Sequence, residues 1–316
     1  MVPIRRFALA PLLALALLLT LAAPGSAEGM ADALAERPKV VVSIFPLHAI
    51  AAGVMAGAGS PELLLDARVS PHDFALKPSQ ARLLQAADLV IWVGERLEFP
   101  LARSLANLPA ARSLGLAAGE DTHGHNADHG HDADRGHAAV HEDPHIWLDP
   151  RAAKEIAAAI AGRLGALDPD YAARYAENAA RLAVRLDALE AELADILRPA
   201  KGIPFIVYHD AYGPFEHRFG LENLGAVTAH PENPPSAARI RRMRDIAAEH
   251  GARCLFREPQ FEPRATAAIT EGNAIRIGDL DPLGVGLEPG INGYFLLLRH
   301  LARNYAACLV SRQKPE

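Results

Sequence analysis

The sequence predicts an α/β protein with two similar parallel-sheet lobes joined by one long, rigid helix. Three observations lead to this fold class: short β-branched stretches alternate with helical ones, a long amphipathic segment occupies the middle of the chain, and the alternation restarts beyond it. The chain has 316 residues, half of them apolar, which is more than one hydrophobic core usually holds. We therefore expect two domains or one large unit with two lobes, and the apolar content is enough for two cores.

Residues 1–27 are typical of a cleavable secretory signal peptide. Arg5 and Arg6 precede an apolar stretch, and the small residues Gly25 and Ala27 fit a cleavage site after Ala27. A transmembrane anchor is the alternative, but the apolar stretch is short and small residues follow it. No cysteine stands at the cleavage site to carry a lipid. We expect an exported protein without a lipid anchor.

The net charge argues against nucleic acid as a partner. The formal charge is −6, and removal of Arg5 and Arg6 with the signal peptide makes it −8. Such a chain has no excess of basic residues for nucleic acid or anionic lipid. An acidic exterior instead suits the approach of a cation.

The N-terminal lobe is expected over residues 28–167. Strand candidates alternate with helix candidates, as parallel α/β units require. The strands are expected at 40–45, 62–65 and 89–93, and the helices at 49–58, 78–86, 100–107 and 151–163.

A His-rich tract at residues 120–143 interrupts this lobe. It contains almost no large apolar residue, so it cannot build a packed core. It holds six of the chain's 14 histidines, interleaved with carboxylates: His123, His125, His129, His131, His137 and His141. Imidazole and carboxylate together suit zinc, copper or nickel, so we interpret the tract as a disordered, auxiliary low-affinity metal loop. The alternative is a solvated linker without a metal function.

Residues 168–199 are expected to form the linking helix. Asp168 is placed as the N-cap, Pro169 at the first helical position and Pro199 just beyond the end. Apolar residues recur at helical spacing, with charged residues on the other faces. A helix of this length reaches from one lobe to the other, which should limit hinge motion between them.

The C-terminal lobe is expected over residues 200–316 and repeats the plan of the first. Strands are expected at 205–208, 223–228, 253–257 and 274–277, with helices at 212–219, 237–250, 263–271 and 293–309. The two cysteines of the chain, Cys254 and Cys308, both lie in this lobe. An even pair in an exported protein predicts a disulfide bond.

Polar residues that follow strands are the candidates for a metal site, because ligands of parallel sheets bind at the carboxyl ends of the strands. His72 and His145 qualify in the first lobe, and His209 and Asp281 in the second. Three imidazoles and one carboxylate make a tetrahedral zinc shell, which would lie in the cleft between the lobes. The spacing of these residues is not a local motif, and a lone histidine is usually an ordinary surface or hydrogen-bonded residue. Glu258 also follows a strand, and we expect it to accept the N–H of a ligand imidazole.

Six phrases of the sequence carry a family resemblance: S-P-H-D-F-A-L-K-P-S-Q, L-V-I-W-V-G, D-P-H-I-W-L-D-P, H-D-A-Y-G-P-F-E-H-R-F-G-L, F-R-E-P-Q-F and D-P-L-G. In this order they resemble the zinc-binding periplasmic components of ABC importers, the ZnuA type. A His-rich insert before the second histidine is also typical of that type. The resemblance implies that His72, His145 and His209 are zinc ligands. It implies Asp281 less directly, because relatives complete the shell with a carboxylate, with water or with a nearby acid.

The resemblance also implies the biological setting. The protein is expected to be a periplasmic monomer that captures Zn²⁺ without catalysis and delivers it to an ABC permease with its ATPase subunit. A periplasmic zinc chaperone is a further expected partner. Two alternatives stay open: a zinc buffer or chaperone whose real site is the His-rich tract, and a zinc-dependent hydrolase with Glu258 as general base. No H-E-x-x-H helix supports the hydrolase.

Overall fold

The computed structural model describes residues 37–117, 143–261, 264–271 and 274–311. All of them lie in one compact unit that begins at Arg37. The expected signal peptide and the six histidines of the His-rich tract lie outside the described residues. Among the helices of the described ranges, none has both the length and the apolar character that a membrane span requires.

Each lobe is built on a four-stranded parallel sheet. In the N-terminal lobe the strand order is β2-β1-β3-β4, where the strands are β1 (Val40–Val42), β2 (Glu62–Leu63), β3 (Leu89–Trp92) and β4 (Ser113–Gly115). In the C-terminal lobe the order is β6-β5-β7-β8, where the strands are β5 (Phe205–His209), β6 (Asn223–Thr228), β7 (Cys254–Arg257) and β8 (Arg276–Asp279). The two halves therefore share one topology, and the predicted fold class is confirmed.

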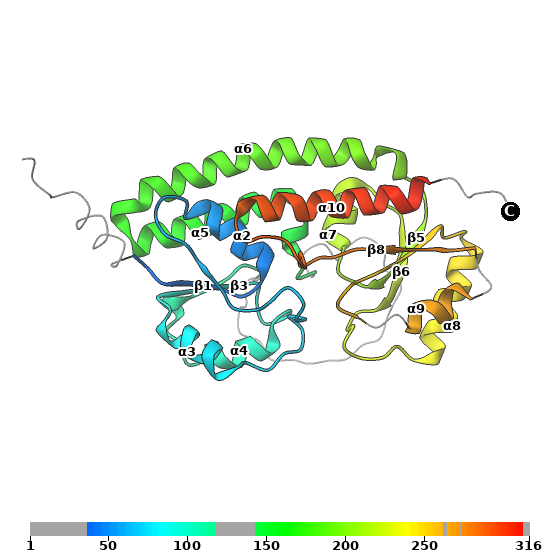
Figure 1. Cartoon of the computed structure of the whole chain (residues 1–316), viewed down its shortest axis with the longest axis horizontal. Helices are drawn as coiled ribbons and strands as arrows, with labels where there is room; N and C mark the ends of the chain where they lie inside the picture. The colour runs from blue at the N-terminus through cyan, green and yellow to red at the C-terminus, as the bar shows by residue number, and fades with distance from the viewer. Residues whose placement is uncertain (1–36, 118–142, 262–263, 272–273, 312–316) are drawn as a thin grey trace, which may run out of the picture. The chain divides into compact units, whose positions relative to one another are not determined.

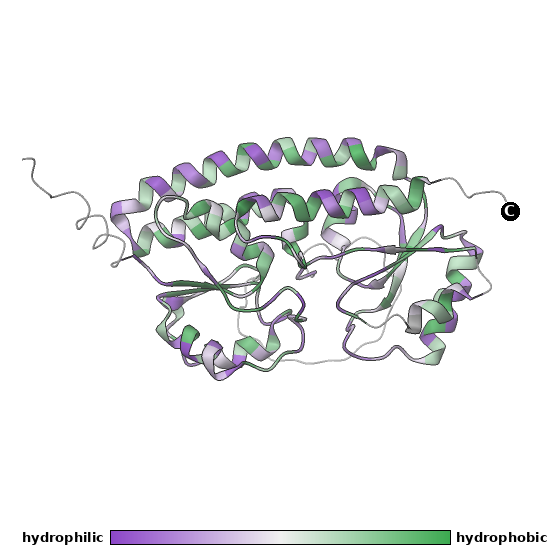
Figure 2. Ribbon diagram, viewed as in Figure 1, coloured by the Kyte–Doolittle hydropathy of each residue, from purple (hydrophilic) through white to green (hydrophobic). Residues whose placement is uncertain are grey.

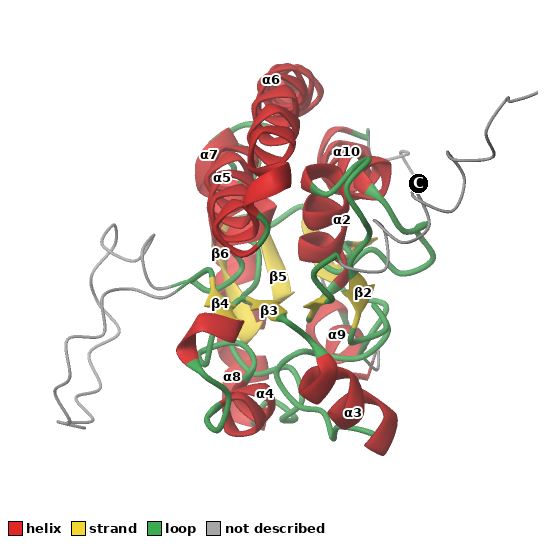
Figure 3. Cartoon of the chain, turned by 90° about the vertical axis from the view of Figure 1, so that its left-hand side faces the viewer, coloured by secondary structure: helices red, strands yellow, loops and turns green. Residues whose placement is uncertain are grey.

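Helices cover both faces of the sheets, so each lobe has three layers (Figure 3). One side is formed by α2 (Phe45–Val54), α5 (Pro150–Leu167), α6 (Ala172–Leu197), α7 (Gly213–Phe219) and α10 (Ile291–Val310). The other side is formed by α3 (Pro78–Ala86), α4 (Phe99–Leu105), α8 (Ala237–Glu249) and α9 (Arg264–Thr270). Short 3₁₀ turns η1 to η4 lie at Ala110–Arg112, Ile146–Leu148, Pro169–Tyr171 and Arg198–Ala200.

Two long helices connect the lobes. The 26-residue helix α6 runs along α5 and α10, and α10 contacts both α2 of the first lobe and β8 of the second (Figure 1). In Figure 2 the strands β1 and β3 are hydrophobic, whereas α6 alternates between hydrophobic and hydrophilic residues, as expected for a helix with one buried face. The main core is continuous from Val41 through Leu186 to Phe256, and a smaller cluster around Met243 lies under α8. The lobes are therefore joined along one side by packed side chains.

Three local expectations differ from the structure. Helix α2 begins at Phe45, four residues earlier than expected, because Pro46 fits the first helical turn and ends the preceding strand. The short strand β4 was not expected, since S-L-G has no β-branched residue. Asp168 does not cap the linking helix with its side chain; its Oδ2 accepts the hydroxyl hydrogen of Tyr175, and a 3₁₀ turn opens the helix.

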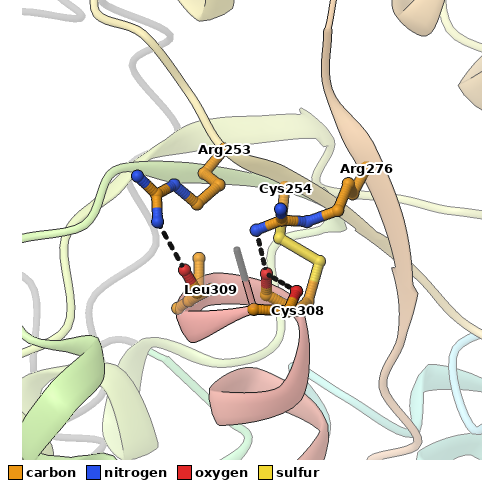
Figure 4. The surroundings of a disulfide bond; sticks show 6 residues. Arg253, Cys254, Arg276, Cys308 and Leu309 are labelled. Atoms are coloured by element: carbon orange, nitrogen blue, oxygen red, sulfur yellow. Dashed lines mark hydrogen bonds between the residues drawn. A yellow bond between two sulfur atoms is a disulfide. The ribbon is translucent and has the colours of Figure 1, made fainter. Parts of the chain in front are cut away.

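The expected disulfide bond is present between Cys254 at the start of β7 and Cys308 near the end of α10. Two arginines lie beside it and donate to the last carbonyl groups of α10 (Figure 4). Arg253 donates to the carbonyl of Leu309 at 3.1 Å, and Arg276 donates to that of Cys308. Cations at this end also suit the negative pole of the helix. Together these bonds attach the end of α10 to the amino-terminal edge of the sheet.

Candidate metal centre

The structure brings His72, His145 and His209 together. His72 lies in the loop between β2 and α3, His145 immediately precedes the 3₁₀ turn η2, and His209 is the last residue of β5. Their ring centroids are 5.1 to 5.5 Å apart, and one ring nitrogen from each lies within 4.8 Å of the other two. The three residues come from separate loops and strand ends that meet at the carboxyl edges of the sheets. His72 and His209 lie after or at the end of a strand, whereas His145 is separated from β4 by residues outside the described ranges.

In each of the three rings, Nε2 is a nitrogen available to a metal. All three Nε2 atoms are buried, and none has a hydrogen-bond partner among the described residues. A buried imidazole nitrogen without a partner is costly, and three such atoms aimed at one point need a ligand that accepts three lone pairs. A metal ion is such a ligand, so the donor set fits a cation that prefers imidazole.

Two carboxylates set the orientation of two of these rings. Asp143 Oδ1 lies 2.8 Å from Nδ1 of His145, and Glu258 Oε1 lies 3.0 Å from Nδ1 of His209. A carboxylate can only accept, so Nδ1 carries the hydrogen in both rings, and the lone pair of the neutral ring is left on Nε2. Tyr212 also donates to Glu258 Oε1, at 2.9 Å, which holds this carboxylate in place.

Burial and mutual repulsion keep His72 neutral. Burial is the largest cause, and the neighbouring His145 and His209 add to it, so that the pKa of His72 is lowered to about 2. In His209, burial is again the largest cause and opposes the charged form, but the carboxylates of Glu258, Glu232 and Asp210 together outweigh it, so the pKa is raised. His72 is therefore ready to bind a cation at any physiological pH, whereas a cation at His209 competes with a proton.

The segment that carries His145 is attached to the C-terminal lobe. Trp147 donates its Nε1 hydrogen to the carbonyl of Pro282 at 2.8 Å, and Tyr294 of α10 donates to the carbonyl of Trp147 at 2.7 Å. Asp149 caps α5 through the N–H of Arg151 and also forms a two-point ion pair with Arg218 of α7. His145 and His209 are thus held as one rigid pair, with the Trp147 ring closing one side of the small pocket between them.

Asp281 lies outside the group of three facing nitrogens. Its carboxylate follows β8 and accepts the backbone N–H groups of Leu283, Gly284 and Val285 and the Nε2 hydrogen of Gln260. These bonds hold the turn after β8. Gln260 and Leu283 both line the pocket of the histidines, so Asp281 is linked to that pocket through its hydrogen-bond partners.

Asp143 is the site residue that sequence reasoning missed. It was assigned to the His-rich loop, whereas the structure places it beside His145, where Oδ1 also accepts the backbone N–H of that residue at 2.9 Å. The D-P-H phrase contained the signal, because an aspartate two residues before a histidine can form such a turn. His48, in contrast, packs as an ordinary core residue and contacts the carbonyl of Pro61.

The chain is similar to known zinc-uptake proteins. The profile of the family described as "Zinc-uptake complex component A periplasmic" matches residues 40–308. The high-affinity zinc uptake system protein ZnuA of Brucella abortus is 41% identical over 308 residues, which cover 87% of this chain and 92% of that protein. The protein of the same name from Paracoccus denitrificans is 43% identical over 304 residues, covering 88% and 93%.

Solved structures show the same fold. A crystal structure of a ZnuA deletion mutant with zinc bound superposes with a TM-score of 0.70 at 26% sequence identity, covering 88% of this chain and all of the other. The likeness extends over both lobes and the helices that connect them.

Proposed function

The chain belongs to the ZnuA family of periplasmic zinc-uptake components, and we propose that it captures Zn²⁺ in the periplasm and delivers it to the permease of an ABC importer. One observation carries the proposal: His72, His145 and His209 each have a buried Nε2 atom without a hydrogen-bond partner among the described residues, and one ring nitrogen of each lies within 4.8 Å of the other two. Zinc accepts imidazole ligands at about 2.0–2.1 Å in a tetrahedral shell, and three histidines supply most of it. An oxygen-richer set would suit manganese better.

Glu258 and Asp143 support this assignment as partners of the ligand rings. Each carboxylate holds the Nδ1 hydrogen of one ligand, which fixes its orientation and increases its basicity. The contact between Glu258 and His209 argues against a hydrolase. Glu258 lies on the Nδ1 side of His209, opposite the nitrogen that would bind zinc, and it is held there by Tyr212. A general base would have to reach a water on the metal instead.

For the fourth ligand we propose Asp281, the acid that follows β8. Its carboxylate has four N–H partners in the described structure, so coordination would replace at least one of them, and Gln260 is the side chain among them. Replacement of Asp281 by asparagine tests this. If Asp281 is the fourth ligand, Asp281→Asn should lower the zinc affinity and change the coordination shell that X-ray absorption detects. An unchanged shell would mean that Asp281 only stabilises the turn after β8.

The cellular setting is part of the same proposal. The leader-like residues 1–27 would direct export to the periplasm and be removed, without a lipid anchor. The receiving partners would be the permease and ATPase subunit of an importer, with a periplasmic zinc chaperone as a further donor. We propose that the protein acts as a monomer. The six histidines between His123 and His141 would collect zinc close to the chain position of His145.

Calorimetric titration with zinc tests the function directly. The mature protein should bind one zinc ion tightly, and weaker binding beyond it should disappear when the His-rich tract is removed. Replacement of His209 by alanine should abolish the tight site and leave the weak one. A tight site that survives in His209→Ala would show that the three histidines are not the zinc centre. The alternative of a buffer based on the tract would then be favoured.

A further inference from the structure

We infer that Ser70, Glu232 and Gln260 form a cross-lobe latch that holds the His72 loop closed and sets the rate at which zinc leaves. This inference rests on the proposed zinc site and concerns its regulation. Ser70 belongs to the N-terminal lobe, in the loop between β2 and α3. Glu232 and Gln260 belong to the C-terminal lobe, in the loops that follow β6 and β7.

His72 differs from the other two histidines in how it is held. His145 and His209 each have a carboxylate on Nδ1, whereas the described residues offer no hydrogen-bond partner to the ring of His72. His72 also lies in a loop without regular secondary structure. Its position therefore depends on what holds this loop, since neither a helix nor a ring partner does.

Two hydrogen bonds attach this loop to the opposite lobe. Ser70 donates its hydroxyl hydrogen to Oε1 of Glu232, and the same hydroxyl oxygen accepts the backbone N–H of His72 at 3.3 Å. Gln260 donates from Nε2 to the carbonyl of Ala67 at 3.3 Å and to Oδ1 of Asp281 at 3.0 Å. The first bond thus connects the backbone of a proposed ligand, through one hydroxyl group, to a carboxylate of the other lobe.

The rest of the contact between the lobes explains why this loop is the part that opens. On one side the lobes are joined by α6, α10 and a shared core. Near the site, the His145 segment is tied to the C-terminal lobe through Trp147 and the Asp149–Arg218 ion pair. Movement of the lobes as rigid bodies would break these packed contacts, whereas movement of the His72 loop requires loss of the two latch bonds. Ser70 and Gln260 both line the pocket, so this loop also controls access to it.

Zinc dissociation into an excess of a chromogenic chelator measures the latch. The variants are Ser70→Ala and Glu232→Gln, each of which removes or weakens the same charged hydrogen bond. We expect dissociation to be about 10-fold faster in each, with an unchanged association rate, since a bond to a charged group contributes on this scale. The double variant should be no faster than Ser70→Ala, because both changes break one interaction. Gln260→Leu should accelerate release by about 3-fold to 5-fold and multiply with Ser70→Ala.

Matched controls separate the latch from general damage. Ser70→Thr keeps the hydroxyl group and should keep slow release. Ser236→Ala removes a hydroxyl that caps α8 within its own lobe, so it should lower thermal stability without faster release. Three results would each contradict the latch. The first is a dissociation rate of Ser70→Ala and Glu232→Gln within 2-fold of the parent. The others are a double variant whose acceleration is the product of the two single effects, and a Ser236→Ala variant that releases zinc equally fast.

The same experiment distinguishes failure of the latch from failure of the zinc site. A parent protein that binds no zinc tightly would refute the proposed function, and the latch with it. A parent that binds one zinc tightly, together with variants that release it at the parental rate, would refute the latch alone.

Discussion

At the scale of single residues, the partners of the ligand rings should determine zinc affinity. Glu258→Gln removes the charge that the Nδ1 hydrogen of His209 faces, and Asp143→Asn does the same for His145. We expect each change to weaken zinc binding by about 10-fold to 100-fold. Competition with a chelator of known affinity measures this.

Asp210→Asn is the matched control for these two variants. Asp210 is also an acid next to a ligand, but its carboxylate makes no hydrogen bond to a ring among the described residues. Its replacement should have a smaller effect than either partner. Equal losses in all three variants would mean that net charge near the site, rather than orientation of the rings, determines affinity.

A second residue-scale prediction concerns Glu216, which is buried in α7. Burial raises its pKa to about 7 from an ordinary value of 4.5, although Asn223 and Tyr305 donate to its two oxygens. The folded state therefore holds the proton more tightly than the unfolded state. The contribution of Glu216 to stability should be greatest below about pH 4.5 and should fall as the pH rises to about 7, by at most roughly 3 kcal/mol.

Thermal unfolding of the apo protein between pH 4.5 and 8 tests this contribution. Glu216→Gln should remove the part of the decline that comes from this residue, because the variant has no proton to lose, while Glu98 keeps its own contribution. The neighbouring Glu222 is exposed, so Glu222→Gln should leave the slope unchanged. A parental slope in Glu216→Gln would assign the pH dependence to other groups.

At the scale of elements, the disulfide bond should stabilise the C-terminal lobe without affecting the metal centre. Cys254 and Cys308 are 54 residues apart, and a closed loop of this length corresponds to about 4 kcal/mol in the chain-entropy treatment. Cys254 lies at the start of β7, whereas the metal centre lies at the carboxyl ends of the strands. Urea unfolding of the Cys254→Ala/Cys308→Ala variant should show the loss of stability, with zinc affinity within 2-fold of the parent.

A large loss of zinc affinity in this variant would contradict that separation. It would mean that the bond between β7 and α10 transmits a change along β7 to Glu258. Retained affinity together with lower stability is the expected pair of results.

Elements and site residues were predictable from the sequence to different degrees. The parallel sheets followed from the alternation of β-branched and Ala-rich stretches. The three histidines were candidates because of their expected places after strands, and the family resemblance assigned them together. Ser70 and Glu232 could not be found in this way, because their contact depends on which loops meet across the lobes, whereas the role of Asp143 is local and was contained in the D-P-H phrase. The residue pattern of one chain segment predicts the local structure of that segment only. The hydrogen bond between Ser70 and Glu232 joins residues that are 162 positions apart, so no such pattern predicts it.

At the scale of the whole molecule, the tight site should not need the His-rich tract. His72, His145 and His209 all lie in described residues outside it, so deletion of residues 122–141 should leave one tight zinc ion and remove weaker binding. The deletion has to end before Asp143. Asp143 must remain, because it holds His145. Zinc titration of this variant, and of one that also removes 142–143, tests the boundary.

The longer deletion should lose affinity as strongly as Asp143→Asn, whereas the shorter one should match the parent in its tight site. Loss of tight binding in the shorter deletion would transfer the receptor function to the tract. The two deletion variants therefore separate the effect of the tract from that of Asp143, the residue that borders it.

The origin of the three ligands in both lobes has a consequence for the life of the protein in the cell. A bound zinc ion connects the His72 loop to the rigid pair of His145 and His209, so the cargo also acts as a folding ligand. A ligand at about 1,000 times its Kd adds about 4 kcal/mol to stability. Periplasmic proteases should therefore degrade the empty receptor faster than the loaded one, and the amount of receptor should follow the zinc supply.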